Sequence, residues 1–381
     1  MTSRYMKRAL VLARRGLGTT SPNPMVGAVI VDPHGHVVAE GYHKKAGGPH
    51  AEVVALGRAG QAARGCTLYV TLEPCNHTGR TPPCTDAIIQ SGIRRVIIAT
   101  ADPNPHVPKG GIERLRQSGI EVVVGDGADE ARMLNRPFFT WSVVGRPWVT
   151  LKIALSLDGK VATTTGESKY LTSAQALQHA HELRRQHDAI LVGSGTILTD
   201  DPHLTYRGRR QGSDPVRVIL DSRGRVSAEA AVFQSESPAP TLVFTREDTS
   251  IEWERELFAV GAEVIRLSPG SDGHLSIPHV LSHLAERRIL SVLVEGGPSI
   301  HAAFIAHHLA DRWVGYLAPV IVGGVGAPSA VAGTGFSLDG APRLHIETVA
   351  RHGPDVVIDA QFLWTHAAAA VPSHVSRMEV H

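Results

Sequence analysis

The amino-acid sequence predicts an α/β protein with two domains. Short apolar stretches alternate with amphipathic ones along the chain, which is typical of strands that alternate with helices. With 381 residues the chain is long enough to form two separate hydrophobic cores. The alternation is interrupted near Gly145 and then restarts. We therefore expect domains over residues 1–145 and 146–366, and a frayed, alanine-rich and polar tail over 367–381.

The first domain is expected to begin with an amphipathic helix, because Tyr5, Met6, Ala9, Leu10 and Ala13 mark one face. Beyond it the pattern predicts strands over 26–31, 37–41, 67–72, 96–100 and 121–124, and helices over 51–59, 85–91 and 111–117. Proline and glycine in the stretches 136–139 and 145–147 predict a linker between the domains.

The second domain repeats the alternation with buried strands. Ser173 lies in a stretch that fits a capping box and opens a helix ending near Gln186. A further helix is expected to start near Ser299. The predicted strands cover 148–154, 189–193, 216–220, 241–244, 263–266, 291–294, 313–318 and 356–362.

One histidine and two cysteines have the spacing of zinc ligands. His50 opens the sequence His50-Ala51-Glu52, Cys75 follows Glu73-Pro74, and Cys84 follows Pro82-Pro83. One imidazole and two thiolates fill three positions of a tetrahedral zinc site and leave the fourth for water. His-x-Glu followed by Pro-Cys and a second cysteine is typical of zinc nucleobase deaminases. Two of these ligands are expected at helix N-termini, where the helix dipole favours a thiolate.

Glu52 is not needed as a ligand, and we expect it to be the catalytic residue that moves protons between the water and a substrate nitrogen. Residues 76–83 separate the two cysteines, where two residues are usual. Arg80 lies in this longer loop and is a candidate for a phosphate contact. Cys66 lies outside the motif, and we interpret it as a packed thiol at a strand edge.

Composition excludes several classes of partner. The formal net charge is +2, which argues against an extended nucleic-acid surface or a polybasic membrane contact. The chain has only 3 cysteines, which favours a reducing, cytoplasmic compartment. The N-terminal apolar stretch is too short for a signal peptide, and no apolar run approaches the roughly 20 residues of a membrane span.

The second half lacks the Gly-x-Gly-x-x-Gly pattern after its first strand, so an ordinary Rossmann site is not indicated. A glycine turn at 295–299 lies between a strand and a helix, where backbone amides can hold a pyrophosphate. A turn of this kind is often only structural.

The motifs of both halves together resemble the bifunctional deaminase-reductase family of riboflavin biosynthesis. In the first half these motifs are residues 22–27, 41–43, 50–52, 71–75, 79–84 and 102–105. In the second half they are Lys152 and residues 156–159, 166–168, 193–202, 221–222 and 295–298. The resemblance covers nearly all of the chain from Tyr5 to about Leu363.

This resemblance implies a fold, two activities and two cofactors. It implies a cytidine-deaminase-like α/β/α sandwich followed by a dihydrofolate-reductase-like α/β domain. The first domain, with one zinc ion per chain, would hydrolytically deaminate 2,5-diamino-6-(5-phosphoribosylamino)pyrimidin-4(3H)-one. The second would reduce the ribosyl chain to ribityl with NADPH. The partner would be this phosphorylated pyrimidine, with no nucleic acid or membrane, and the chain would form a homo-oligomer through the reductase domain.

The resemblance also assigns site residues. Zinc would be held by His50, Cys75 and Cys84, with Glu52 as the proton shuttle. Cofactor contacts map to Ala154, Tyr170, Thr196, Asp200, Ser222, Gly297, Pro298, Ser299, Ile300, His301, Ala302 and Ala303. Substrate contacts map to Asn23, His43, Arg80, Lys152, Ser168, Arg184, Leu204, Arg207 and Glu295. Arg184 and Arg207 are the natural phosphate holders, because guanidinium donors match phosphate oxygens.

Two positions depart from the family, and several alternatives stay open. Tyr170 stands where the family usually has tryptophan, and Asn76 stands where it often has serine. Asn23 also suits a role in shaping the Pro-Asn-Pro turn, and Lys152 suits a strand end that reaches water. Two rival functions are a zinc deaminase of tRNA or free nucleosides and a non-catalytic scaffold. The balanced charge and the second domain argue against the first, and the complete zinc motif argues against the second.

Overall fold

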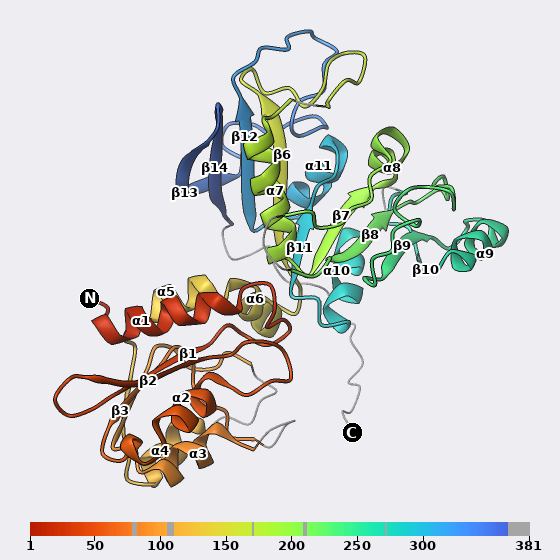
Figure 1. The fold of residues 1–381 in the computed structure, drawn as a ribbon. Coiled ribbons are helices and arrows are strands. Elements are labelled where there is room, and N and C mark those ends of the chain that lie inside the picture. Colours follow the sequence, from red (N-terminus) through yellow and green to blue (C-terminus); the bar gives the residue numbers. More distant parts are fainter. Residues whose placement is uncertain (78–81, 105–109, 170, 209–211, 271–272, 365–381) are drawn as a thin grey trace. The chain divides into compact units, whose positions relative to one another are not determined.

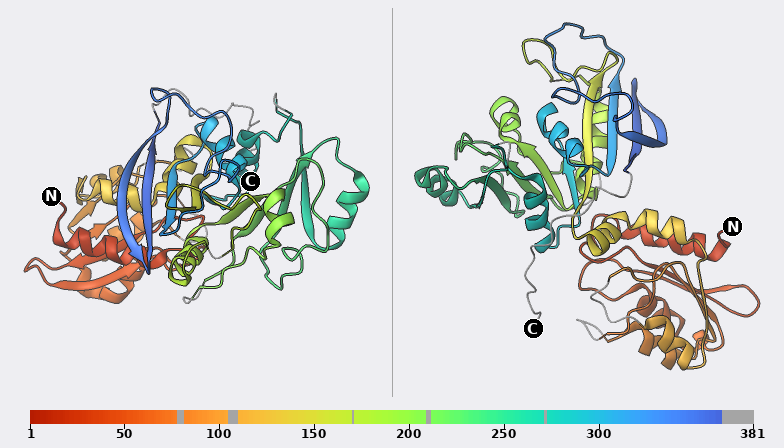
Figure 2. Two further views of the ribbon diagram at one scale, coloured as in Figure 1. Left: turned by 90° about the horizontal axis from the view of Figure 1, so that it is seen from above. Right: turned by 180° about the vertical axis from the view of Figure 1, so that it is seen from behind.

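The computed structural model describes residues 1–77, 82–104, 110–169, 171–208, 212–270 and 273–364 (Figure 1). The backbone packs into two compact units, Met1–Val143 and Val144–His381. Each unit has its own sheet with helices on both faces (Figure 2). Among the described residues no helix is long and apolar enough to span a membrane.

The first unit contains a five-stranded sheet in the order β2-β1-β3-β4-β5. Strand β1 (Gly27–Val31) pairs antiparallel with β2 (Val37–Tyr42) and with β3 (Thr67–Val70). Strands β3, β4 (Arg95–Ile98) and β5 (Glu121–Val124) are parallel to one another. The carboxyl ends of β3 and β4 therefore lie at the same edge of the sheet, where the loop that carries Cys75 begins.

Helices cover both faces of this sheet (Figure 1). Helix α1 (Arg4–Ala13) packs with α5 (Ala128–Leu134) against Val29 and Val31. Helices α2 (Ala51–Ala59), α3 (Cys84–Ser91) and α4 (Gly111–Gln117) pack on the other face, where Ala28 and Ile30 point. Successive side chains of a strand point to opposite faces, so β1 contributes to both cores. The predicted α/β/α sandwich is confirmed.

Two short 3₁₀ helices, η1 (Arg14–Gly16) and η2 (Gly60–Ala63), follow α1 and α2. The prediction of a linker that starts at Arg136 is wrong, because helix α6 occupies Arg136–Val144. Pro137 is the second residue of this helix, a position at which the missing N–H of proline has no intrahelical partner to lose.

The second unit contains a nine-stranded sheet in the order β10-β9-β8-β7-β11-β6-β12-β14-β13. The strands from β10 to β12 are parallel, and β14 and β13 continue the sheet in antiparallel pairing. Their bounds are β6 (Trp148–Ser156), β7 (Ala189–Gly193), β8 (Val216–Leu220), β9 (Thr241–Arg246), β10 (Ala262–Leu267), β11 (Ser291–Val294), β12 (Arg312–Ala318), β13 (Arg343–His352) and β14 (Asp355–Leu363).

Helices α10 (Ile277–Glu286) and α11 (Pro298–Ala306) cover one face of this sheet, and α7 (Ala174–Gln186), α8 (Ser194–Asp200) and α9 (Ile251–Ala259) cover the other. The helix predicted to open at Ser173 is confirmed, since the hydroxyl of Ser173 accepts a hydrogen bond from the amide of Ala176. Helices α5, α8, α9 and α10 and strand β13 were not predicted. Strand β13 is exposed along nearly its whole length, so burial imposes no pattern on its sequence.

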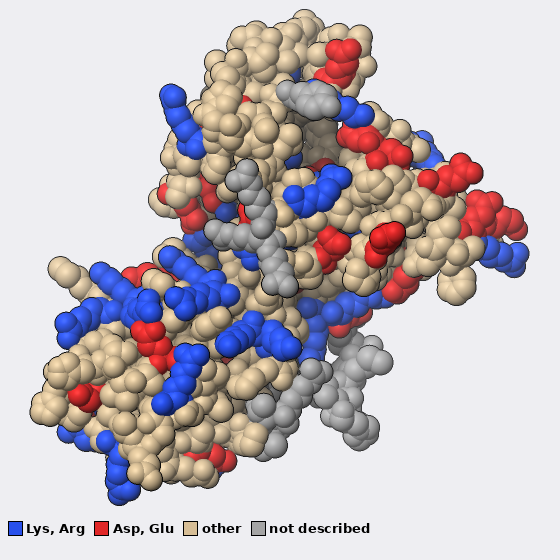
Figure 3. Space-filling view, in the orientation of Figure 1, with Lys and Arg blue, Asp and Glu red and all other residues tan. Residues whose placement is uncertain are grey.

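Charged residues are distributed differently on the two units. In Figure 3 basic side chains gather over the face of the first unit along α1, whereas both signs are interspersed on the visible face of the second unit. Helix α1 and the turn after it contribute Arg4, Lys7, Arg8, Arg14 and Arg15. Arg8 pairs with Glu40, so part of this positive charge is neutralised locally.

Candidate metal centre and reductase site

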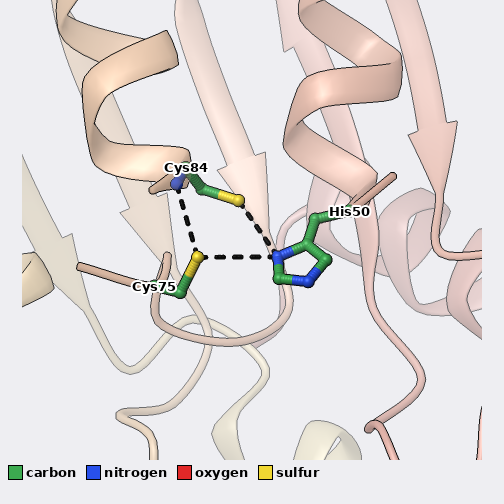
Figure 4. A group of neighbouring side chains, drawn as sticks. All are labelled: His50, Cys75 and Cys84. Carbon is green, nitrogen blue, oxygen red and sulfur yellow. Dashed lines mark hydrogen bonds between the residues drawn. The ribbon is translucent and has the colours of Figure 1, made fainter. Parts of the chain in front are cut away.

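His50, Cys75 and Cys84 converge at one end of the first sheet (Figure 4). His50 is the N-cap of α2, Cys84 is the first residue of α3, and Cys75 lies in the loop after β3. Nδ1 of His50 lies 3.2 Å from Sγ of Cys84 and 3.6 Å from Sγ of Cys75. The three ligand atoms all lie within 4.8 Å of one another, and one imidazole with two thiolates is a donor set that zinc prefers, so this set can hold zinc.

The long interval between the cysteines folds back onto the site. The amide of Cys84 donates to Sγ of Cys75 over 3.3 Å, and the amide of Thr85 donates to the carbonyl of Cys75 over 3.2 Å. The Thr85 hydroxyl also donates to the side chain of Asn76 over 3.1 Å. The start of α3 thus fixes Cys75 directly. The candidate phosphate contact Arg80 lies outside the described residues.

The pKa values of the two thiols are shifted in opposite directions. Hydrogen bonding from Cys84 and from the ring of His50 lowers the pKa of Cys75 to about 4, although burial opposes this. The pKa of Cys84 is raised, because its thiol donates to Cys75 and is itself buried. As thiolates, these two cysteines supply the negative charge that a divalent cation requires.

Glu52 lies in the first turn of α2 and is 3% exposed. Burial raises the pKa of its carboxyl group, and His50 partly offsets this effect. Its carboxylate is not part of the cluster of three ligand atoms. A buried carboxyl group two residues after a ligand, with an increased affinity for a proton, has the properties required of a proton shuttle.

Asn23 and His43 form one hydrogen-bonded unit beside the ligands. The rings of His43 and His50 meet edge to face with centroids 5.4 Å apart. Nδ1 of His43 lies 3.0 Å from the carbonyl of Pro49, and Nε2 lies 3.1 Å from Nδ2 of Asn23. Burial lowers the pKa of His43, so the ring is neutral. Its Nδ1–H donates to Pro49, its Nε2 accepts from Asn23, and Oδ1 of Asn23 is left for another donor.

A second cluster of charged side chains lies in the second unit. Arg184 of α7 forms two hydrogen bonds with Glu295 over 2.9 and 3.1 Å, and Nζ of Lys152 lies 3.8 Å from the same carboxylate. Burial by itself would raise the pKa of Glu295, but Arg184 and Lys152 outweigh it and lower the pKa to about 2. Three residues predicted as substrate contacts are thus brought together from β6, α7 and the loop after β11.

Arg184, which is predicted to hold a phosphate, uses three of its five N–H donors within the protein. Its guanidinium is engaged by Glu295, and a third bond runs from Nη1 to the carbonyl of Thr205 over 2.9 Å. This last bond fixes the loop that carries Leu204, which is buried, and Arg207, which is exposed. Ser168 is half-buried, and Tyr170 lies outside the described residues.

The glycine turn lies between β11 and α11, as expected. Gly297 is the N-cap of α11, and no atom lies within 4 Å of a Cβ built on it. At Gly296 a Cβ would lie 2.7 Å from Cβ of Ile300, so that glycine is required by packing. The open space at Gly297 fits the close approach of a phosphate to a helix N-terminus, the mode of contact expected for NADPH.

The remaining predicted cofactor contacts follow the carboxyl ends of neighbouring parallel strands, at one edge of the sheet. In the orientation of Figure 3 the surface of the second unit is hollowed near this edge. Ala154 lies on β6, half-buried Thr196 and exposed Asp200 lie on α8 after β7, and half-buried Ser222 follows β8. On α11, Ser299 is exposed, His301 is buried, and Pro298, Ile300, Ala302 and Ala303 are half-buried.

Two residues near these sites were not predicted. The carboxylate of Glu73 accepts amide hydrogen bonds from Asp102 and Ile112 and so holds the loop after β4 beside Cys75. His181 lies on α7 three residues before Arg184, and Arg184, Arg207 and Lys152 all affect its pKa. Its spacing from Arg184 places both on one helix face, and this was the signal available in the sequence.

Comparison with known proteins identifies a family for each half of the chain. Residues 1–100 match the family model of the cytidine and deoxycytidylate deaminase zinc-binding region, and residues 147–358 match that of the RibD C-terminal domain. The riboflavin biosynthesis protein RibD of Aquifex aeolicus is 50% identical over 84% of this chain and 87% of its own length. That of Escherichia coli is 40% identical over 93% of this chain and 97% of its own length.

Solved structures give the same result. RibD of Acinetobacter baumannii matches with a TM-score of 0.85 and 35% identity, covering 94% of this chain and 98% of that one. A protein of Thermotoga maritima matches with a TM-score of 0.83 and 40% identity, with the same coverage. It is described as a diaminohydroxyphosphoribosylaminopyrimidine deaminase/5-amino-6-(5-phosphoribosylamino)uracil reductase. Since relatives this similar are matched over nearly their whole length and across both units, the chain belongs to the RibD family of bifunctional riboflavin-biosynthesis enzymes, with a deaminase domain followed by a reductase domain.

Proposed function

We propose that this chain deaminates 2,5-diamino-6-(5-phosphoribosylamino)pyrimidin-4(3H)-one and then reduces the ribosyl chain of the product with NADPH. The observation that carries the proposal is the convergence of His50, Cys75 and Cys84 beside Glu52, in a chain that continues into a RibD C-terminal domain. Membership of the RibD family, and the activities described for the Thermotoga maritima relative, support this substrate.

In the deaminase site each residue has a defined task. Zinc bound by His50, Cys75 and Cys84 would supply an activated water for hydrolysis. The carboxyl group of Glu52 holds a proton more tightly than an exposed glutamate, so it can carry one to the departing amine. Oδ1 of Asn23, oriented by the bond from Nδ2 to His43, can accept an N–H from the pyrimidine. Arg80 stays a candidate for the phosphate.

In the reductase site the charged cluster positions the sugar chain. NADPH would supply the reducing equivalents when bound. Its phosphates would lie against the N-terminus of α11 at Gly297, and the remaining contacts would come from the predicted residues after β6, β7 and β8. Lys152, held by Glu295, would present an ammonium group to the sugar oxygens. Arg207, which is exposed, and the two remaining N–H donors of Arg184 would bind the phosphate.

The proposal also covers the cellular compartment and the oligomeric state. The chain would act in the cytoplasm, since none of its three cysteines forms a disulfide, as expected in a reducing compartment. It would form a homo-oligomer through the reductase domain. The support for this is the edge strand β13, which leaves Leu344, Ile346 and Val349 exposed at 38%, 56% and 62%. A long exposed edge strand with several exposed apolar side chains is a natural site for a second copy.

The test uses the purified full chain with the diaminopyrimidine, with and without NADPH, and follows ammonia release and NADPH oxidation separately. We expect about one zinc per chain, ammonia release without NADPH, and NADPH oxidation only after deamination. Cys75→Ser should stop ammonia release and leave reduction of the deaminated substrate intact. Deamination of cytidine or tRNA in place of this pyrimidine, or deamination by zinc-free protein, would refute the proposal.

A further inference from the structure

Lys152 contacts an aromatic ring as well as a carboxylate. Its Nζ lies 3.8 Å from Oε2 of Glu295, and it lies over the ring of Tyr316 at 5.7 Å from the ring centroid. The face of an aromatic ring is negative and attracts a cation within about 6 Å, so this is a cation–π contact. The side chain of Lys152 is only 17% exposed, which strengthens the contact because little water screens it.

The sheet of the second unit places this ring. Strands β6 and β12 are parallel neighbours, and Lys152 is paired with Val314. Successive side chains of a strand alternate between the two faces, so Tyr316 lies on the same face as Val314, one step further along β12. Tyr316 is 1% exposed and belongs to one buried cluster with Leu183 of α7. The ring is therefore a fixed part of the core.

A hydrogen bond sets the orientation of the ring. The Tyr316 hydroxyl lies 2.8 Å from Nδ1 of His179 on α7. Burial raises the pKa of Tyr316 and lowers the pKa of His179, so the hydroxyl keeps its proton and donates a hydrogen bond to the neutral imidazole. The His179 ring in turn lies against the ring of His352, with centroids 4.2 Å apart. Helix α7 and the end of β13 thus hold the tyrosine side chain in place.

Packing alone does not require a tyrosine at this position. An aliphatic side chain would fill the core between β12 and α7 without burying a hydroxyl group. The stem of a lysine is flexible, and Glu295 shares its carboxylate between Lys152 and Arg184. A rigid ring face beside the ammonium group restricts the positions that this group can take.

We propose that Tyr316 is a positioning residue of the reductase site, whose ring holds the ammonium group of Lys152 in place for the sugar chain of the substrate. The inference rests on the proposed function for the reaction that Lys152 serves. Tyr316 is too deeply buried to reach the substrate itself, so its replacement should act through Lys152. His179 supports this role through its hydrogen bond.

The test compares Tyr316→Leu, Tyr316→Phe and the control Val357→Ala in the zinc-loaded full chain. Leucine removes the aromatic face, whereas phenylalanine keeps it and removes only the hydrogen bond to His179. Val357 is buried in the same cluster, so its truncation disturbs the packing and leaves the ring in place. The readouts are kcat and KM for reduction of the deaminated substrate, the Kd for NADPH and thermal stability. Tyr316→Leu is also combined with Lys152→Met.

We expect Tyr316→Leu to lower the kcat of reduction roughly tenfold, which corresponds to the loss of a partly desolvated cation–π contact. The Kd for NADPH should stay near wild type, and Tyr316→Phe should retain most of the kcat. In the Lys152→Met background, Tyr316→Leu should have no further effect on kcat, because the contact is already missing. The inference is overturned by an equal loss in that background, or by a similar loss of kcat in Val357→Ala.

A readout without turnover separates this inference from the proposed function. In carbon–proton NMR spectra the side-chain methylene signals of Lys152, identified by their absence from Lys152→Met, should carry an upfield ring-current shift. The shift should persist in Tyr316→Phe and disappear in Tyr316→Leu. Ordinary lysine shifts in the wild-type chain would overturn the inference, whether or not the chain reduces the substrate. If the shift is present and the wild-type chain does not reduce the substrate, the proposed function fails instead.

Discussion

Replacement of Gly297 by valine is expected to abolish tight NADPH binding without disturbing the fold. Gly297 has φ −75° and ψ 177°, an extended conformation that any residue adopts and that suits a position before proline. No atom lies within 4 Å of a Cβ built there, so the valine side chain has room in the protein. It would occupy the space through which a phosphate reaches the N-terminus of α11.

The magnitude follows from the donors at this turn. Pro298 has no N–H, and the amides of Ile300 and His301 already donate to the carbonyl of Gly297. The amides of residues 296, 297 and 299 remain for a phosphate. Loss of one charge-assisted hydrogen bond, about 1.5–3 kcal/mol, and of the dipole interaction, about 0.3–1 kcal/mol, amounts to about 2–4 kcal/mol. The Kd for NADPH should therefore rise roughly 30- to 700-fold.

The assay is a titration of NADPH into folded Gly297→Val, followed by calorimetry or by cofactor fluorescence. Zinc content, ammonia release and thermal stability should match wild type. The adjacent variant Gly296→Ala is the contrasting control, because its Cβ would lie 2.7 Å from Cβ of Ile300 and should lower stability. A Kd for Gly297→Val within twofold of wild type, in protein that is fully folded, would refute the assignment of this turn to the phosphates.

Three further variants test single residues. Glu52→Gln should retain zinc but lose deamination by on the order of 10²-fold or more, because the shuttle is removed and the ligands stay; loss of zinc would contradict this role. Asp311→Ala should lower the free energy of unfolding, measured by urea titration, by about 3–5 kcal/mol, because it leaves the buried guanidinium of Arg146 unpaired. The control Glu113→Ala, which removes an exposed ion pair, should lower it by less than about 1 kcal/mol. His187 has a pKa lowered to about 4 by burial and an ordinary value of 6.5 when unfolded, so the unfolded chain binds the extra proton and stability falls as the pH drops from about 6.5 towards 4. The free energy of unfolding from urea titrations should fall by about 2 kcal/mol between pH 7.5 and pH 5 because of this group. The fall should be smaller in His187→Gln, and an equal pH dependence in the variant would contradict this role of His187.

The metal centre could be predicted because its signal is local. The residue types at His50, Cys75 and Cys84 indicate a zinc site. The helices that start at residues 51 and 84 place His50 and Cys84 at helix N-termini. The eight intervening residues left the return of the second thiolate open. The structure closes this gap with bonds from the first amides of α3 to Cys75, which no periodicity in the sequence indicates.

The helix over Arg136–Val144 shows how local signals mislead. A proline was interpreted as the sign of a linker, yet proline is tolerated in the first turn of a helix. Strand β13 shows the opposite difficulty. It is exposed on both sides, so its alternation of residues carries no information about a buried face, and its place in the sheet depends on pairing with β14.

The reductase site could be predicted only as a set of residues, since pairing among them is decided in three dimensions. Glu295 lies more than a hundred residues after both Lys152 and Arg184 in the sequence. Only the fold of the second unit brings the three side chains together. Arg184 uses three of its five N–H donors on Glu295 and on the carbonyl of Thr205, so only the other two remain for a ligand. A residue's type therefore sets what it is able to bind, but its neighbours set what it is still free to bind.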